Sequence, residues 1–158
     1  MSYEDFTIKA REAILKAQQT AAGYEQQHVD SAHLLKAMFD IDDSITDFLL
    51  KKADVNMTRF KTDLDKLIWE TPRVQGGADK QYLTAEANKA ISTAKSMLKD
   101  FGDEYISLEI LLLGIAKGND KTGKMLRENG ATVEVLTAAV KELRKGRKVT
   151  EETTDNVY

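Results

Sequence analysis

The chain has 158 residues, among them one proline, nine glycines and no cysteine, and its formal net charge is −3. A chain of this length buries roughly 70% of its unfolded surface and can fold as one domain, while the absence of cysteine excludes disulfides and thiolate metal sites. The slightly acidic balance, without long runs of like charge, argues against nucleic acid as a partner.

The proportions of apolar and charged residues favour helices. Hydrophobic residues make up 42% of the chain and charged residues 31%, which suits amphipathic helices with solvated outer faces, so we expect an all-α fold. The longest apolar run, residues 110–116, is far shorter than the roughly 18 residues that cross a bilayer. The first five residues are acidic where a signal peptide would be basic. We therefore expect a cytoplasmic protein without membrane contact.

A first helix is expected to begin near Thr7, whose hydroxyl can accept a hydrogen bond from an amide of the first turn. Gly23 is a suitable left-handed stop for this helix. Between them, apolar residues recur at spacings of three and four and so share one face of the helix. They are Ala10, Ala13, Ile14, Ala17 and Ala21. Most of these side chains are small, so a neighbouring helix can approach closely.

A short second helix and a brief third helix are expected next. Asp30 or Ser31 can cap the second helix. A polar stretch over residues 40–44 predicts a loop, and apolar residues recur again over residues 45–50. The apolar residues expected to face inward from these two helices are Leu34, Leu35, Met38, Phe39, Ile45, Phe48, Leu49 and Leu50.

A fourth helix is expected to begin after Asn56, a good N-cap residue, and to end near Trp69. It should end there because Pro72 cannot continue a helix and disfavours helical backbone at the preceding residue. The inward-facing residues of this helix are Phe60, Leu64, Leu67 and Ile68. Residues 71–80, with one proline and two glycines, have the composition of a linker.

The remainder of the chain repeats the first half. Val29 corresponds to Ile106 at an offset of 77 residues, and His33 corresponds to Glu109 at an offset of 76, which indicates a duplication. Four further helices follow from this repeat. They are marked by the caps Thr84, Ser107 and Thr132 and by the apolar pair Met125 and Leu126.

The fold predicted from the repeat is two pseudo-two-fold-related four-helix repeats packed as one domain. Repeat one covers residues 1–70, a linker loop covers residues 71–82 and repeat two covers residues 83–145. The two should pack together because a unit of about 70 residues has a marginal core by itself. Residues 146–158 lack a helical period and are expected to begin an interdomain linker.

Several short motifs occur in a fixed order along this repeat. They are Gly-Asp-Glu-Tyr-Ile-Ser-Leu-Glu at 102–109, Pro-Arg-Val-Gln-Gly at 72–76, Tyr-Leu-Thr at 82–84 and Val-Thr at 149–150. Together with the threonine-capped first and fifth helices, this pattern resembles the Clp N-domain, the mobile N-terminal module of the ATP-driven Clp unfoldases. Within that family, the motifs are most similar to those of ClpB-type disaggregases.

The resemblance implies a substrate-binding module. A Clp N-domain over residues 1–145 would capture exposed apolar segments of unfolded or aggregated proteins and deliver them to the pore of a hexameric ring. ATP and magnesium would bind to other domains of the parent protein. This chain by itself is therefore expected to be non-catalytic, without a cofactor, and monomeric when isolated.

The resemblance also implies where clients bind. Family positions implicated in client binding match Thr7, Asp103 and Glu109 here, beside an apolar groove. That groove would be lined by Ile14, Ile91 and Ile110. By chemistry alone, caps and turns explain the first three residues and the core explains the isoleucines, so the client-binding role depends on the resemblance. If the groove exists, an exposed apolar patch is expected between the first, fifth and sixth helices.

The alternative interpretation is an N-domain that docks a folded adaptor for a Clp unfoldase that feeds a protease. ClpC-type members, which bind phosphoarginine, carry Gly-Thr-Glu-His in each repeat. Ala32 and Leu108 occupy the two glutamate positions in this chain. Because no carboxylate is present there for bidentate binding of a guanidinium, the sequence favours the disaggregase.

Signals for an enzyme or a metal site are weak. Residues 118–125 match the glycine spacing of a phosphate-binding loop, but Met125 replaces the Ser or Thr that would bind magnesium, and the preceding segment is predicted to be helical. His28 and His33 are five residues apart and lack the frame of a zinc site. We therefore expect no catalytic, cofactor-binding or metal-binding residues.

Overall fold

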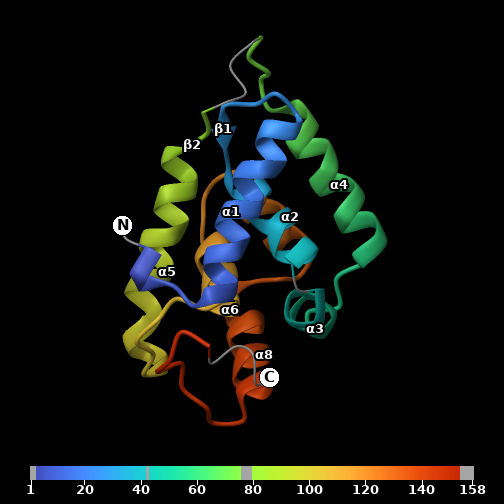
Figure 1. The fold of residues 1–158 in the computed structure, drawn as a ribbon. Helices are drawn as coiled ribbons and strands as arrows, with labels where there is room; N and C mark the ends of the chain where they lie inside the picture. Colours follow the sequence, from blue (N-terminus) through green and yellow to red (C-terminus); the bar gives the residue numbers. More distant parts are fainter. Residues whose placement is uncertain (1–2, 42, 76–79, 154–158) are drawn as a thin grey trace.

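The expected all-α architecture with two four-helix repeats is confirmed (Figure 1). The structure is a computed structural model, and it describes residues 3–41, 43–75 and 80–153. Within these ranges there are eight α-helices, preceded by a 3-10 helix, η1 (Tyr3–Asp5). The helices are α1 (Ile8–Gly23), α2 (Ser31–Ile41), α3 (Asp43–Lys52), α4 (Met57–Glu70), α5 (Ala85–Phe101), α6 (Leu108–Ala116), α7 (Lys121–Glu128) and α8 (Val133–Arg144).

Five predicted N-caps are confirmed by hydrogen bonds. In each case the side-chain oxygen accepts from the backbone amide three residues later, at donor–acceptor distances of 3.1 to 3.5 Å. The five caps are Thr7, Asn56, Thr84, Ser107 and Thr132. Because this bond satisfies an amide that has no partner within the helix, each cap fixes the residue at which its helix begins.

The loop predicted over residues 40–44 is wrong. Helix α2 continues to Ile41 and α3 already begins at Asp43, and residue 42 between them lies outside the described residues. Phe39 near the end of α2 and Ile45 near the start of α3 are both buried. The helices therefore anchor their facing ends in the core, and Asp40, Asp43 and Ser44 belong to helices instead of a loop.

Gly23 does not provide the predicted left-handed stop. It is the last residue of α1, and the left-handed conformation falls on Glu25, with φ of 58°. The amide of Gln26 donates to the carbonyl of Ala21 at 2.9 Å, so the helix is closed two residues later than its glycine suggested. In the second repeat Gly102 does take this conformation, with φ of 70°.

The two repeats are joined by reciprocal parallel strand contacts, which the sequence did not predict. Strand β1 (His28–Val29) pairs with β2 (Tyr82–Leu83), and an isolated bridge pairs Phe6 with Ile106. Leu83 follows Phe6, and Ile106 follows Val29, by the same 77 residues. In each pairing, the turn after the first helix of one repeat lies beside the segment that precedes the first helix of the other repeat. This is the pseudo-two-fold relation expected from the duplication.

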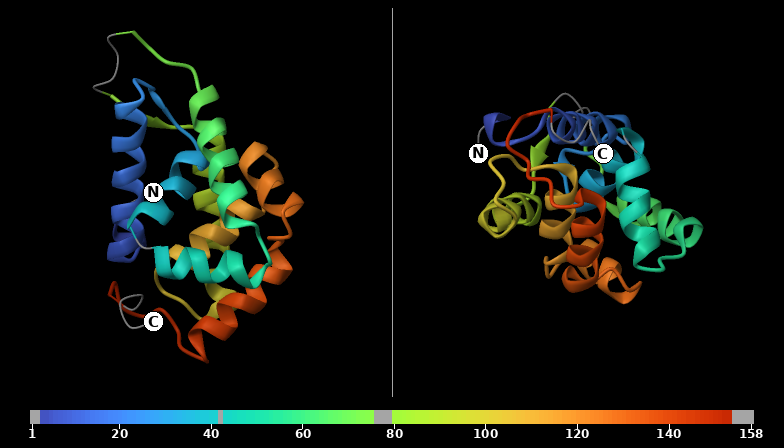
Figure 2. Two further views of the ribbon diagram at one scale, coloured as in Figure 1. Left: turned by 90° about the vertical axis from the view of Figure 1, so that its right-hand side faces the viewer. Right: turned by 90° about the horizontal axis from the view of Figure 1, so that it is seen from below.

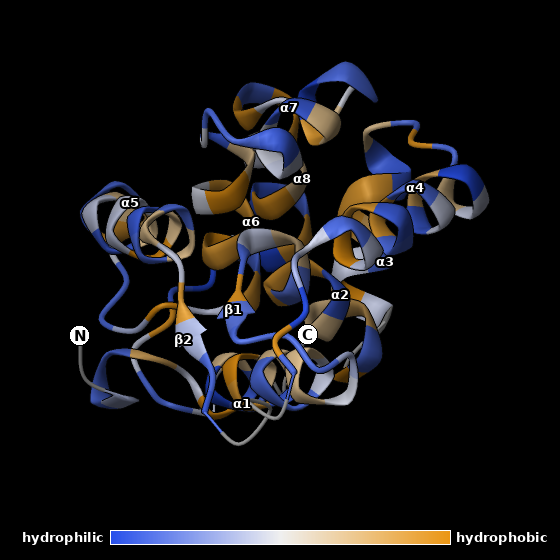
Figure 3. Ribbon diagram, turned by 90° about the horizontal axis from the view of Figure 1, so that it is seen from above, coloured by the Kyte–Doolittle hydropathy of each residue, from blue (hydrophilic) through white to orange (hydrophobic). Residues whose placement is uncertain are grey.

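The helices are arranged around α6. Its nine residues are all buried, and Figure 3 shows its apolar residues at the centre of the ring formed by the other helices. Helix α1 packs on α2 and α5 packs on α6, while α1 also contacts α6 and α2 contacts α5. Figure 1 shows α1 and α5 running in opposite directions, and Figure 2 shows α3 lying across α8. No helix in the described part of the chain is long and apolar enough to span a bilayer.

The predicted linker loop crosses the end of repeat one. Its residues 76–79, which include both glycines of the loop, lie outside the described residues. Before them, Arg73 Nε donates to the carbonyl of Tyr24 at 3.0 Å, and the amide of Val74 donates to Glu25 at 2.8 Å. The Arg73 guanidinium also stacks on the Trp69 ring, with its carbon 3.9 Å from the ring centroid. The start of this loop is therefore anchored to the turn after α1.

The close packing of α5 on α6 depends on Gly114. An added Cβ at this position would overlap the Ala90 carbonyl oxygen and come within 3.0 Å of the Ala94 Cβ. We expect Gly114→Ala to lower the free energy of unfolding by about 1–3 kcal/mol or more, because the two backbones would have to separate. Urea denaturation monitored by circular dichroism measures this change.

Gly23→Ala is the matched control. An added Cβ there meets nothing within 4 Å, and the residue is helical. This substitution should leave stability unchanged or raise it by up to about 1 kcal/mol, because alanine has less conformational entropy to lose on folding. Equal stability of the two variants would contradict the close α5–α6 contact.

Candidate functional site

A shallow groove separates α1 from α5. Its volume is about 210 Å³, and its lining combines apolar side chains with two amides. The lining residues are Tyr3, Phe6, Ile14, Gln18, Leu83, Asn88 and Ile91. Phe6 and the two isoleucines are buried and form the floor, whereas the Tyr3 side chain is 48% exposed at the rim. Thr7 caps α1 and Thr84 caps α5, so these two threonines fix where the helices that form the groove walls begin.

Two of the three isoleucines predicted for the groove lie in it. Ile14 and Ile91 line the groove and retain 4% and 2% of their accessible surface. Ile110 is 0% exposed and belongs to the core, because every residue of the short helix α6 is enclosed by its neighbours. The expected placement of Ile110 on the groove is therefore wrong. The sequence also missed Tyr3, Phe6 and Leu83, although their position just before each first helix was available as a signal.

A buried charged cluster holds the two predicted carboxylates. Arg144, the last residue of α8, donates from Nη1 and Nη2 to the two carboxylate oxygens of Asp103, at 2.8 Å each. Its Nε donates to Glu109 Oε2 at 3.1 Å, and Nη2 also reaches the hydroxyl of Ser107 at 3.3 Å. Arg144 and Glu109 are almost completely buried, and Asp103 is only 9% exposed. We call Asp103, Ser107, Glu109 and Arg144 the charged lock.

Thr7, Asp103 and Glu109 all lie in the interior, with Asp103 retaining 9% of its accessible surface and the other two none. The Thr7 side chain is buried, accepts from the amide of Ala10, and its backbone amide donates to Ile106. Asp103 and Glu109 are buried against Arg144 for the physical reason that a buried carboxylate requires a partner. The expectation that these carboxylates face a bound peptide is not supported by this geometry. A role of the three positions in client binding stays a prediction.

Repeat one contains a neutral counterpart of the charged lock. Gln26 corresponds to Asp103 at an offset of 77, and His33 corresponds to Glu109 at 76. His33 Nε2 lies 2.7 Å from Gln26 Oε1, and Gln26 Nε2 donates to the carbonyl of Ile68 at 2.7 Å. Ile68 stands 76 residues before Arg144. Gln26, His33 and the Ile68 carbonyl form the neutral lock, which ties the same three segments together without charge.

The neutral lock requires an uncharged imidazole. The amide of Asp30 donates to His33 Nδ1 at 3.0 Å, so Nδ1 is an acceptor and Nε2 carries the proton that is donated to Gln26. Burial lowers the pKa of His33 to about 4, against a smaller opposing effect of the Asp30 carboxylate. His33 is therefore neutral at physiological pH.

The segment after α8 packs back on the domain as far as it is described. Val149 is buried, its amide donates to Asp103 Oδ1 at 3.0 Å, and its carbonyl accepts from Glu104 at 2.8 Å. Further on, the carbonyl of Glu152 accepts from the amide of Ile8 at 2.9 Å. Residues 146–153 are thus attached to the first turn of α1 and to the charged lock, whereas residues 154–158 lie outside the described residues. That this segment begins an interdomain linker stays a prediction.

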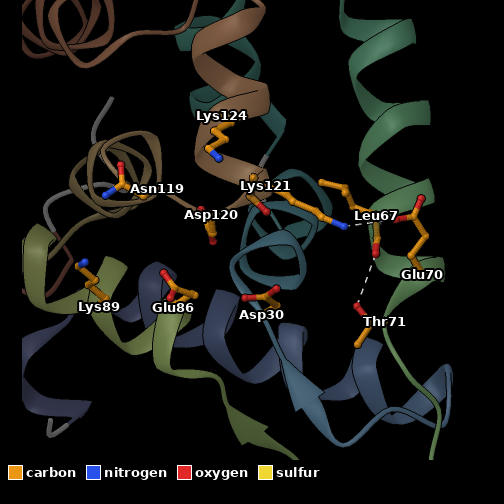
Figure 4. A pocket seen from close by; sticks show the side chains of 11 residues that line it. Asp30, Leu67, Glu70, Thr71, Glu86, Lys89, Asn119, Asp120, Lys121 and Lys124 are labelled. Atoms are coloured by element: carbon orange, nitrogen blue, oxygen red, sulfur yellow. Dashed lines mark hydrogen bonds and ion pairs between the residues drawn. The ribbon is translucent and has the colours of Figure 1, made fainter.

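A larger hollow of about 520 Å³ lies on another face, between α2, α4, α5 and α7 (Figure 4). Its charged lining alternates in sign. The lining acids are Asp30, Glu70, Glu86 and Asp120, and the lining lysines are Lys89, Lys121 and Lys124. Asp30 and Asp120 are already engaged, because Asp30 accepts from Thr84 and Asp120 accepts from the hydroxyl of Ser31. The hollow therefore offers neither a strongly anionic nor a strongly cationic site.

The glycine-spaced segment 118–125 does not have the strand-to-helix setting of a phosphate-binding loop. The loop leads from a helix into α7, and the Asp120 carboxylate accepts the amide of Gly123 at 3.1 Å. An acidic cap thus occupies the place where a phosphate would bind. Within the described ranges, no group of three or more histidine or acidic side chains is arranged to hold a metal ion.

The charged lock generates a stability prediction. Arg144→Met leaves two carboxylates buried without a cation, and we expect the free energy of unfolding to fall by about 3–5 kcal/mol. The same substitution at exposed Arg59, which lies 3.9 Å from Asp63, should change it by less than about 1 kcal/mol. Chemical denaturation measures both variants. Adding Asp103→Asn and Glu109→Gln to Arg144→Met should restore part of the loss, and no recovery would contradict the electrostatic explanation.

The neutral lock generates a pH prediction. Between pH 6.5 and 4 the unfolded chain binds a proton at His33 that the folded chain does not, so stability falls as the pH decreases. From pH 7 to pH 5 this residue should contribute a loss of about 2 kcal/mol. His33→Gln should remove that contribution, whereas exposed His28→Gln should retain it, when unfolding is measured at each pH. Identical pH profiles for the two variants would show that His33 is not the responsible group.

Comparisons with known proteins agree with this fold. Residues 5–129 match the model of the Clp repeat (R) N-terminal domain family. The chain is similar to Chaperone protein ClpB of Porphyromonas gingivalis, with 37% identity over 158 residues, and to Chaperone protein ClpB of Bacteroides thetaiotaomicron, with 33% identity over 158 residues. Each alignment covers all of this chain and 18% of the relative.

A solved structure provides an independent comparison of the fold. The crystal structure of the Hsp104 N-terminal domain from Candida albicans superposes with a TM-score of 0.82 at 19% sequence identity, covering 96% of this chain and 99% of that one. At 19% identity this structural likeness supports the fold alone. Common ancestry is supported by the family model and by the alignments over the whole chain. The chain belongs to the Clp repeat (R) N-terminal domain family, and within it is similar to the N-terminal part of ClpB chaperones.

Proposed function

We propose that this domain captures exposed apolar segments of unfolded or aggregated proteins in the groove between α1 and α5. The observation that carries the proposal is the lining of this groove, where an apolar floor from Phe6, Ile14 and Ile91 meets the partly exposed rim residues Tyr3 and Leu83. Apolar surface lined in this way gains free energy when another apolar chain covers it. The amides of Gln18 and Asn88 at the groove can bond to peptide backbone without selecting a side chain.

The size of the groove favours a peptide over a small-molecule ligand. Its volume of about 210 Å³ is below the roughly 300–1,000 Å³ of small-molecule sites. A site of this size accepts individual side chains of an extended segment, and the small buried area keeps the affinity low. Low affinity suits a module that passes its client on. The chain spans 18% of the length of its ClpB relatives, so ATP hydrolysis and ring assembly belong, in this proposal, to other domains.

The proposal predicts that charge on the groove rim weakens binding. Tyr3→Glu combined with Leu83→Glu should weaken binding of an apolar peptide by about tenfold or more, because the peptide would then cover two carboxylates. Ile110→Asp is unsuitable as a test, because it would place a charge in the core. Fluorescence anisotropy with a labelled unfolded client segment measures the affinity.

Leu15→Glu is the matched control. Leu15 is 52% exposed on α1 but does not line the groove, so its substitution should leave the affinity within about twofold of the parent chain. Equal weakening by both variants would contradict capture in the groove. Strong dependence on salt, combined with indifference to the Tyr3 and Leu83 substitutions, would instead support the alternative in which a charged face docks a folded adaptor.

A further inference from the structure

The walls of the groove are copies of each other. Leu83 corresponds to Phe6 and Ile91 to Ile14, each at an offset of 77, and all four residues line the groove. The helices that carry the isoleucines run in opposite directions (Figure 1). Equivalent residues that face each other on antiparallel helices are related by a two-fold axis perpendicular to both helices. The pseudo-two-fold axis of the domain therefore passes through the groove.

The hydrogen bonds beside the groove obey the same symmetry. The amide of Thr7 donates to Ile106 and the amide of Thr84 donates to Val29, both at 3.0 Å. These amides begin α1 and α5, and their bonds within the protein are already made. These two amides are therefore not available to a bound peptide and cannot impose one strand direction on it, as the edge of a sheet does.

We infer that the groove accepts apolar client segments in either chain direction, an inference that rests on the proposed function. Rotation by the pseudo-two-fold reverses an extended peptide and presents it with the same two apolar pairs, whereas Tyr3 corresponds to Lys80 and has no apolar counterpart. Because hydrophobic burial is non-directional, the two orientations gain similar free energy. The consequence for a capture module is that a segment is held whichever way the client happens to present it.

Polar residues on the two helices break this symmetry. Gln18 corresponds to Lys95, which lies 3.3 Å from Asp5 in an exposed ion pair. Since α1 and α5 are antiparallel, Gln18 and Lys95 lie toward opposite ends of this pair of helices, and only Gln18 lines the groove itself. An acidic residue at one end of a client segment should therefore favour the orientation that brings it to Lys95, whereas a neutral segment should show no preference.

The test compares a short apolar peptide that has neutral serine and glycine flanks with its reversed sequence. Anisotropy titrations should give dissociation constants within about threefold of each other. In a second measurement, a nitroxide is attached to one end of the peptide and then to the other, and the backbone amide signals near Gln18 and near Lys95 are recorded. Each label should broaden both sets of signals.

A one-directional groove would give different results. A larger difference in affinity between the two sequences, or a label that broadens only one end, would overturn this inference and leave capture in the groove intact. Absence of binding by both peptides would overturn the proposed function together with the inference. A glutamate added to one end of the peptide should shift broadening toward one end of the groove, and Lys95→Gln should cancel that shift. If Lys95→Gln leaves the shift unchanged, the assigned source of orientation is wrong.

Discussion

The reciprocal pairing of the two repeats is the constraint on which the rest of the structure depends. The turn after each first helix is hydrogen-bonded to the segment that enters the other repeat's first helix, so Val29 pairs with Leu83 and Ile106 with Phe6. Neither repeat can complete its own ladder. This exchange brings α1 and α5 to opposite sides of the groove and encloses α6. The groove is thus a product of the interface between the repeats, and no single repeat contains it.

Each repeat stabilises its turn with a lock of the same geometry and different chemistry. Repeat two uses Arg144 with two carboxylates, and repeat one uses His33, Gln26 and a backbone carbonyl. Duplicated sites can diverge in this way because a buried polar group needs a complete set of partners, and either a charged or a neutral set meets that requirement. The charged version is not fully complete, since Glu109 Oε1 has no hydrogen-bond partner among the described residues. Loss of one member therefore leaves larger unbalanced charge in repeat two than in repeat one.

The charged lock also connects the helices to the segment after α8, residues 146–153. Asp103 accepts both the Arg144 guanidinium and the amide of Val149, and Glu152 bonds to the first turn of α1. Substitution of Asp103 would therefore disturb the position of the segment after α8 as well as the fold. This arrangement gives the positions highlighted by the family resemblance a structural explanation that needs no direct contact with a client.

The eight helices, five of their caps, the duplication and the family resemblance could all be predicted from the amino-acid sequence. These features depend on residues close together in the chain or on a repeat visible in the sequence. The sequence could not separate Ile110, which is core, from Ile14 and Ile91, which reach the groove, because all three have the same helical spacing. Only the tertiary structure decided this, and also that Asp103 and Glu109 are joined to Arg144, 41 and 35 residues away, since a partner that distant leaves no periodic signal. Exposure and pairing are set by contacts between elements that are far apart in the chain, such as the strand pairings between the two repeats.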